Sequence, residues 1–134
     1  MDARGALDRL QAAKADGSLN ELCERFGLDL VVVFGSVIRD DAEPRDLDIA
    51  VHYRGERPSP VAMVEAFVQL TRFDQIDLMD LNRADPFARE QALVGTLPLV
   101  ERDSELLPTM QMTAMNQRMD TEWLHRMSLE AMAG

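Results

Sequence analysis

Two aspartates separated by one residue, Asp46 and Asp48, carry the clearest chemical signal in this sequence. Residues at positions i and i+2 of a strand share one face, so both carboxylates are expected to project side by side. Like charges this close repel each other, and folding alone gives no reason to pair them. A divalent cation would relieve the repulsion, because clustered carboxylate oxygens suit hard cations. The alternative interpretation is a solvated strand face.

A third carboxylate, Asp77, stands in the otherwise apolar segment Ile76–Leu78. An unpaired charge in the middle of a strand is costly unless it meets water or a partner. If this strand lies beside that of Asp46 and Asp48, the three carboxylates form one cluster. Such a cluster can hold two Mg²⁺ ions about 4 Å apart, as in phosphoryl and nucleotidyl transfer. Asp80 is the rival third ligand, but its opposite parity should point it away from Asp77.

A glycine and a serine, Gly35 and Ser36, follow the apolar run of residues 30–34 directly. Backbone N–H groups at such a bend can cradle phosphate oxygens, and the serine adds a hydroxyl. The same pair is also typical of an ordinary turn. His52 shares the face of Asp46 and Asp48 by parity, and it is either a substrate contact or a surface residue.

The elements that would position these residues are predicted from hydrophobic periodicity and from helix start and stop signals. Ser18 and Glu21 form a capping-box pattern at the start of the second helix. Pro98 restricts the last strand to an edge of the sheet. We expect an α+β fold with a small mixed or antiparallel sheet flanked by helices. The predicted helices are 2–15, 18–26, 60–70, 86–94 and 103–133, and the predicted strands are 30–34, 46–53, 75–81 and 97–101.

The composition bounds the class of protein. The chain has 134 residues, enough for one domain, with a core at about 18–102 and a C-terminal helical segment at about 103–133. The formal charge of −10 disfavours direct binding to nucleic acid. No membrane-spanning run or signal peptide is visible, so we expect a cytoplasmic protein. Cys23, the single cysteine, is predicted to be a small buried apolar residue.

The C-terminal segment carries a methionine-rich stripe. Met112, Met115, Met119, Trp123 and Met127 recur at three- and four-residue spacing. A helix of nearly thirty residues is about 40 Å long, longer than a domain of this size can cover. The proximal part is expected to pack on the sheet. The distal part, around Trp123 to Met132, is expected to contact another chain, since methionine-rich surfaces adapt to partners.

The three signals together resemble a known signature. Gly35–Ser36, nine residues, and then Asp46-Leu47-Asp48 resemble the GS…DxD motif of the DNA polymerase β-like nucleotidyltransferase superfamily. Ile76-Asp77-Leu78 resembles the strand that supplies the third carboxylate of that superfamily. At this length, the chain is similar to minimal nucleotidyltransferases of the MntA type, which are antitoxins encoded beside HEPN-domain RNase toxins. The resemblance spans about residues 18 to 125 and implies the polymerase β palm-like fold.

The resemblance implies roles for the acidic residues. Asp46 and Asp48 would bind two Mg²⁺ ions, and Asp77 would bind the catalytic ion and help to deprotonate the attacking hydroxyl. AMP would pass from ATP to a tyrosine hydroxyl of the HEPN toxin. Two other functions stay open. The chain could neutralise a toxin by binding alone, or it could modify a small molecule such as an antibiotic, although it has little room for a deep acceptor pocket.

The resemblance also implies a phosphate-binding role for Gly35, Ser36 and Arg39. Gly35 and Ser36 would hold the β- and γ-phosphates of the nucleoside triphosphate, and Arg39 would meet either phosphate or Asp40. Asp40 occupies the position where relatives have a glycine. This departure puts a negative charge beside a loop that must accept a triphosphate.

Overall fold

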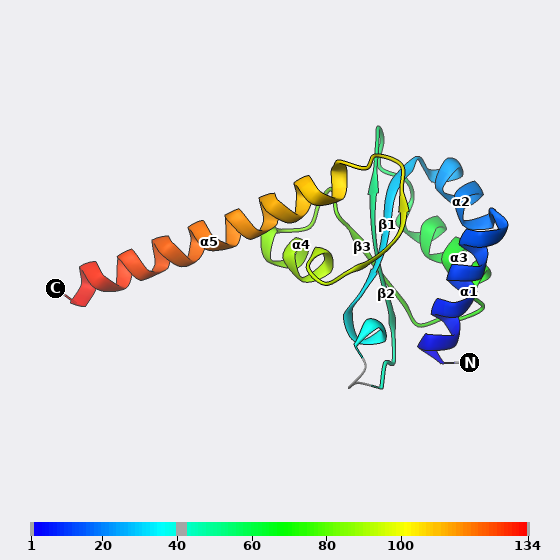
Figure 1. The fold of residues 1–134 in the computed structure, drawn as a ribbon, viewed down its shortest axis with the longest axis horizontal. Coiled ribbons are helices and arrows are strands. Elements are labelled where there is room, and N and C mark those ends of the chain that lie inside the picture. Colours follow the sequence, from blue (N-terminus) through cyan, green and yellow to red (C-terminus); the bar gives the residue numbers. More distant parts are fainter. Residues whose placement is uncertain (1, 40–42, 134) are drawn as a thin grey trace.

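Four strands form one sheet in the order β3-β2-β1-β4 (Figure 1). In this computed structural model, the structure describes residues 2–39 and 43–133, without the side chains at 118, 120–125 and 128–133. The elements along the chain are α1 Ala3–Asp16, α2 Ser18–Phe26, β1 Leu28–Phe34, the 3₁₀ helix η1 Gly35–Ile38, β2 Leu47–Tyr53, α3 Pro60–Thr71, β3 Ile76–Asp80, α4 Pro86–Leu93, β4 Leu97–Glu101 and α5 Leu106–Ala133.

The sheet is mixed, as the sequence predicts. β1 pairs with β2 and with β4 in the antiparallel direction, whereas β2 and β3 are parallel. β4 lies at one edge of the sheet. A sheet tolerates a proline such as Pro98 there, because proline has no N–H to donate to a neighbouring strand. β1 is central and almost wholly buried, which explains its continuous run of aliphatic residues. The antiparallel β1–β2 pair therefore brings the end of β1 beside the start of β2.

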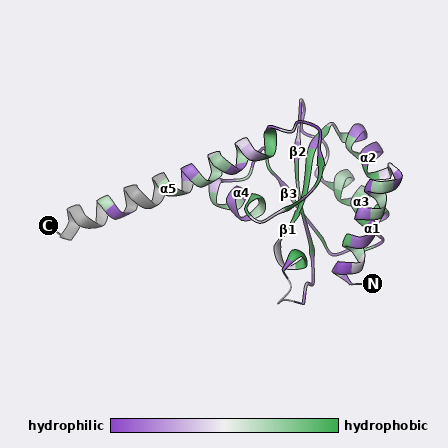
Figure 2. Cartoon of the chain, in the orientation of Figure 1, coloured by the Kyte–Doolittle hydropathy of each residue, from purple (hydrophilic) through white to green (hydrophobic). Residues whose placement is uncertain are grey.

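Helices cover both faces of the sheet. The face covered by α1, α2 and α3 holds the larger core, which includes Leu10, Leu19 and Phe67. The face covered by α4 and the start of α5 holds a smaller core, which includes Leu30, Leu93 and Leu107. In Figure 2 the strands are mainly hydrophobic, while hydrophilic residues alternate with hydrophobic ones along α1 and α2. This is the pattern of helices with one buried face.

Capping explains where two of the helices begin. Ser59 accepts a bond from the Ala62 N–H before α3, and Asp85 accepts one from the Ala88 N–H before α4. The predicted capping box at Ser18 is wrong. Gly17 caps α2, and the Ser18 hydroxyl instead donates to Asp16 at 2.6 Å. The short link between α1 and α2 leaves Ser18 inside the helix.

Cys23 is fully buried in the larger core, as predicted. Burial raises the pKa of its thiol to about 11. At pH 8, the folded protein should react with a thiol reagent at least about a hundredfold more slowly than an unfolded chain does, because little thiolate forms. Labelling with a chromogenic disulfide in buffer and in urea tests this expectation. Fast labelling of the folded protein would contradict it.

α5 extends well beyond the sheet (Figure 1). Its first turns pack on the smaller core through Leu106, Leu107 and Met110. Ala114 is the last of its buried residues among those whose side chains are described. Met112, Met115, Met119 and Met127 are all exposed, whereas the side chains of Trp123 and Met132 lie outside the described part. In the described residues, no helix is long and apolar enough to cross a membrane.

Candidate functional site

Asp48 is the centre of the site, because strand pairing brings two predicted residues beside it. In the antiparallel β1–β2 ladder it lies opposite Phe34, the residue directly before Gly35. In the parallel β2–β3 ladder it lies opposite Asp77. Directly opposite residues on neighbouring strands project from the same face of the sheet. The predicted meeting of Asp48 and Asp77 is therefore present, and the end of β1 adjoins both.

Gly35 lies against the Asp48 carboxylate. Its φ of 79° is in the left-handed region, which glycine adopts at little cost. A Cβ added there would lie 2.2 Å from Oδ2 of Asp48, closer than side-chain packing allows. Only a glycine lets the carboxylate approach the backbone at this bend. The type of residue at position 35 is thus set both by the turn and by the acidic side chain beside it.

The electrostatics of Asp48 reflect crowding of carboxylates. Its pKa is raised to about 6, first by burial and then by the negative charges of Asp77 and Asp46. A hydrogen bond between the Asp48 and Asp77 side chains adds to the shift, while the charge of Arg39 opposes it. Two carboxylates can share such a bond only when one of them is protonated. A bound proton here relieves the repulsion that a cation could also relieve.

The remaining predicted residues surround this pair. Asp46 is exposed and lies in a bend directly before β2. Ser36 lies in the first turn of η1, and its carbonyl accepts a bond from the Arg39 N–H at 3.2 Å. Arg39 is exposed at the end of that turn. Asp40, the departure from the usual glycine, lies outside the described residues.

The carboxylates fit a hard divalent cation in chemistry and charge. Two further carboxylates, Asp46 and Asp77, lie close enough to Asp48 to raise its pKa, and carboxylate oxygens are the preferred ligands of Mg²⁺. As they stand, however, no three Asp, Glu, His or Cys side chains of the described ranges converge on a single metal position. Binding would therefore require rotation of the exposed Asp46 and Asp77 side chains toward Asp48.

Asp80 is not part of the group. Its carboxylate accepts a bond from the Tyr53 hydroxyl at 3.0 Å and one from the Asn82 N–H at 2.9 Å. Arg57 lies 3.4 Å from the same carboxylate. As parity predicts, these contacts hold Asp80 at the far end of β3, away from Asp77. Of the two rivals, Asp77 is the one that adjoins Asp48.

A family model for polymerase beta nucleotidyltransferases matches residues 18–105, a range that contains the whole carboxylate group. The chain belongs to the polymerase β nucleotidyltransferase family. The match begins at α2 and ends directly before α5. No curated protein matches the chain.

Solved structures share the fold of this nucleotidyltransferase at low sequence identity. A mutant MntA–HpeT toxin–antitoxin structure has a TM-score of 0.66 at 15% identity, covering 88% of this chain and 98% of the other. The tri-AMPylated Shewanella oneidensis HEPN toxin in complex with an MNT antitoxin matches with a TM-score of 0.65 at 16% identity, covering 92% and 99%. A toxin–antitoxin structure with AMP-PNP has a TM-score of 0.66 at 15% identity, covering 87% and 96%.

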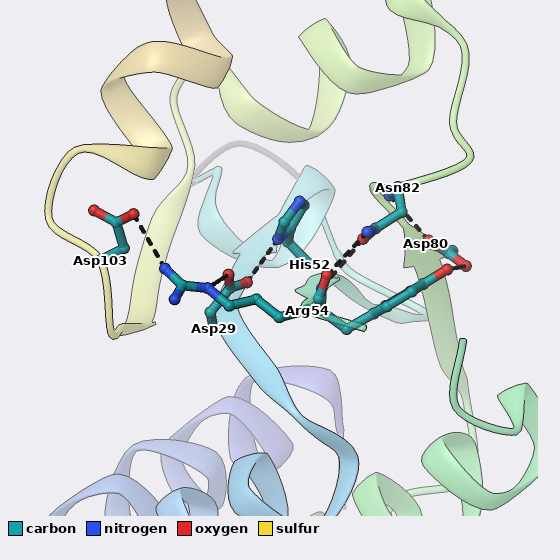
Figure 3. A network of polar contacts seen from close by, with 7 residues as sticks. Asp29, His52, Arg54, Asp80, Asn82 and Asp103 are labelled. Atoms are coloured by element: carbon teal, nitrogen blue, oxygen red, sulfur yellow. Dashed lines mark hydrogen bonds and ion pairs between the residues drawn. The ribbon is translucent and has the colours of Figure 1, made fainter. Parts of the chain in front are cut away.

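This nucleotidyltransferase also contains a polar network that the sequence analysis missed (Figure 3). Nδ1 of His52 lies 2.6 Å from Asp29, whose side chain is only 5% exposed. Arg54 donates to the same carboxylate at 3.0 Å and to Asp103 at 3.3 Å. His52 is therefore neither a free surface residue nor placed at the Asp48 site. It belongs to a network that joins β1 and β2 to the segment before α5.

Asp29 could have been noticed as the one charged residue in the apolar segment 28–34. Two features hide its role. The register between β1 and β2 shifts between Leu28 and Leu30, so Asp29 lies at an irregularity of the ladder. Such irregularities redirect a side chain relative to simple alternation. Period-two reasoning from the sequence therefore could not place Asp29 beside His52.

Proposed function

We propose that this chain is an antitoxin nucleotidyltransferase that transfers AMP from ATP to a tyrosine hydroxyl of a HEPN-type RNase toxin in the cytoplasm. The observation that carries the proposal is the register of Asp48 against Asp77, with Gly35 packed on the same carboxylate. This arrangement gathers acidic oxygens beside a bend suited to phosphate. The family membership and the likeness to toxin–antitoxin structures support the same reaction class.

In the proposed reaction, the acceptor oxygen attacks the α-phosphorus of ATP. A new oxygen–phosphorus bond forms, the bond between the α-phosphorus and the α,β-bridging oxygen breaks, and pyrophosphate leaves. Asp77 holds the acceptor hydroxyl in place and takes up its proton. Gly35 and Ser36 orient the β- and γ-phosphates through the backbone of η1, while Arg39 offsets their charge.

Asp46, Asp48 and Asp77 would hold two Mg²⁺ ions in this proposal. When bound, the ions would supply charge neutralisation for the polyphosphate. Without the ions, three carboxylates would repel the negatively charged triphosphate of ATP, in a chain whose formal charge is already −10. Isothermal titration of Mg²⁺ into the wild type and into Asp46→Asn tests the assignment without any turnover. Equal affinity in both proteins would remove Asp46 from the site.

A second candidate function is neutralisation of the toxin by binding alone. Among the described residues, no three acidic, histidine or cysteine side chains converge on one metal position, and this favours binding alone. The acidic charge would also complement the basic groove of an RNase. A toxicity assay with the Asp46→Ala, Asp48→Ala double variant separates the two functions. Full protection of cells by this variant supports binding alone, and loss of protection supports transfer.

The part of α5 beyond Ala114 supplies a partner surface in this proposal. Its described methionines, Met115, Met119 and Met127, are between 44% and 58% exposed, and isolated helices of this length are marginal in water. Trypsin should therefore remove the last fifteen or so residues rapidly from the isolated protein and much more slowly from its toxin complex. Protection of this segment in the isolated monomer would contradict the partner assignment.

A further inference from the structure

An arginine from the N-terminal helix reaches the end of the phosphate-binding turn. Nη2 of Arg4 donates to the carbonyl oxygen of Arg39 at 3.2 Å, across 35 positions of sequence. Arg4 lies in the first turn of α1, which precedes the range that the family model matches. The contact therefore joins this chain's N-terminal helix directly to the turn formed by η1.

The helix that carries Arg4 is firmly placed. Ala3 and Ala6, on either side of Arg4, are fully buried in the larger core. Val37 of η1 belongs to the same core cluster, so the start of α1 and the turn share one packed base. Asp2 caps the helix by accepting a bond from the Gly5 N–H at 2.8 Å. The backbone that carries the Arg4 side chain is therefore held in a fixed position.

The orientation of the Arg39 carbonyl affects where the Arg39 side chain can lie. The Arg39 N–H closes η1 by bonding to Ser36, and Arg39 itself is extended, with φ −100° and ψ 130°. Fixing its carbonyl fixes the peptide plane that follows its Cα and limits the directions open to its side chain. A charge-assisted bond from a guanidinium is among the stronger ways to hold an exposed carbonyl. The charge of Arg39 already acts on Asp48, so its direction matters to the site.

We propose that Arg4 is a positioning residue for the phosphate-binding turn: it holds the Arg39 backbone so that the Arg39 guanidinium faces the β- and γ-phosphates of the bound nucleotide. This inference rests on the proposed function, because it assigns Arg39 to the triphosphate. Arg4 pre-organises the turn for binding of the nucleotide. Its loss therefore weakens binding of the polyphosphate more than it slows the transfer step.

The test compares three variants of the full chain: Arg4→Met, Arg4→Lys and Arg9→Met. Methionine keeps much of the apolar stem and removes the donors, and lysine restores a charged donor. Arg9, another exposed arginine of α1, is the matched control, because it makes no hydrogen bond or ion pair among the described residues. The probes are pyrophosphate and ATP in calorimetric titrations, followed by KM for ATP and kcat with the toxin as acceptor.

Arg4→Met should weaken pyrophosphate and ATP binding by about tenfold, the effect of one charge-assisted hydrogen bond. KM should rise by a similar factor, kcat should change less than twofold, and the unfolding temperature should stay near that of the wild type. Arg4→Lys should recover most of the affinity, and Arg9→Met should match the wild type. Unchanged affinity in Arg4→Met, absence of rescue by lysine, or an equal loss in Arg9→Met would overturn the inference.

The two proposals fail in different ways. A wild type that binds ATP and pyrophosphate but responds equally to all three substitutions overturns only the role of Arg4. A wild type that binds neither compound overturns the proposed function, and the role of Arg4 with it.

Discussion

Asp48→Asn should reduce nucleotidyl transfer by about a thousandfold or more, at the upper end of the effect of removing one preorganised electrostatic group. Within the described ranges, Asp48 is the one carboxylate that adjoins Gly35, Asp77 and Asp46 at once, so its charge is central to the group. Asparagine keeps the size of the side chain and removes the charge. The rate of AMP transfer to the toxin under single-turnover conditions measures the loss.

The same substitution should stabilise the fold, and the effect should depend on pH. The pKa of Asp48 is raised from 3.8 to about 6 in the folded state, so the folded state binds its proton more tightly than the unfolded state does. Stability from this proton is fully present below about pH 4 and is lost as the pH rises through 6. Above that range, the wild type has a charged carboxylate in a crowded site, which costs stability that asparagine avoids.

The gain expected from Asp48→Asn is about 1–2 kcal/mol at pH 8, after allowance for solvent screening of a half-buried group. It should vanish near pH 3.5, where Asp48 is protonated in both states. Urea unfolding at pH 8 and at pH 3.5, in the absence of divalent cations, measures the gain in stability and its disappearance. Asp8→Asn, which removes an exposed acid from α1, is the control and should change neither activity nor stability. A destabilised Asp48→Asn at pH 8 would contradict this description of the site.

Gly35→Ala should have the second largest effect, because it acts on the turn and on Asp48 together. A non-glycine residue in the left-handed region costs about 1–2 kcal/mol. The new Cβ would also meet Oδ2 of Asp48, so that carboxylate must move from its present place. We expect a fall in transfer of about a hundredfold or more, comparable with loss of one electrostatic group. Urea unfolding and single-turnover transfer measure the two effects.

Gly55→Ala is a matched control for this substitution. Gly55 has a φ of 81°, close to the 79° of Gly35, but nothing lies within 4 Å of a Cβ placed there. Both variants should lose the stability that the left-handed backbone costs, Gly35→Ala at least as much as Gly55→Ala, while only Gly35→Ala loses transfer. If Gly55→Ala lost transfer to the same extent, the effect at Gly35 would be due to general destabilisation. The displacement of Asp48 would then have no part in it.

Alternation along regular strands was sufficient to predict that the carboxylates of Asp48 and Asp77 lie side by side. Alternation separated Asp77 from Asp80, and the register of β2 and β3 places Asp77 opposite Asp48. Asp46 lies in the bend before β2, outside this ladder. The helix starts at Ser59 and Asp85 followed from capping chemistry, which involves only a few neighbouring residues. Such signals depend on short segments of sequence, so the tertiary structure had little opportunity to override them.

The features that escaped prediction depend on the tertiary structure. The Asp29–His52 contact requires an irregular register between β1 and β2, and the bond from Arg4 to Arg39 spans 35 positions. Neither leaves a periodic trace in the sequence. The capping box at Ser18 failed because Gly17 alone turns the chain between two helices, which makes Ser18 the first helical residue. In each case, packing of distant elements decided where a polar side chain found its partner.

The most direct test of the account uses ATP labelled at the α-phosphate and a HEPN-domain toxin co-expressed with this chain. We predict that the wild type transfers the label to a tyrosine of the toxin and that Asp48→Asn, folded and still able to bind the toxin, transfers none. Label that reaches the toxin equally with Asp48→Asn would contradict the assigned site. A toxin that is bound and neutralised by the wild type without acquiring any label would contradict the transferase function itself.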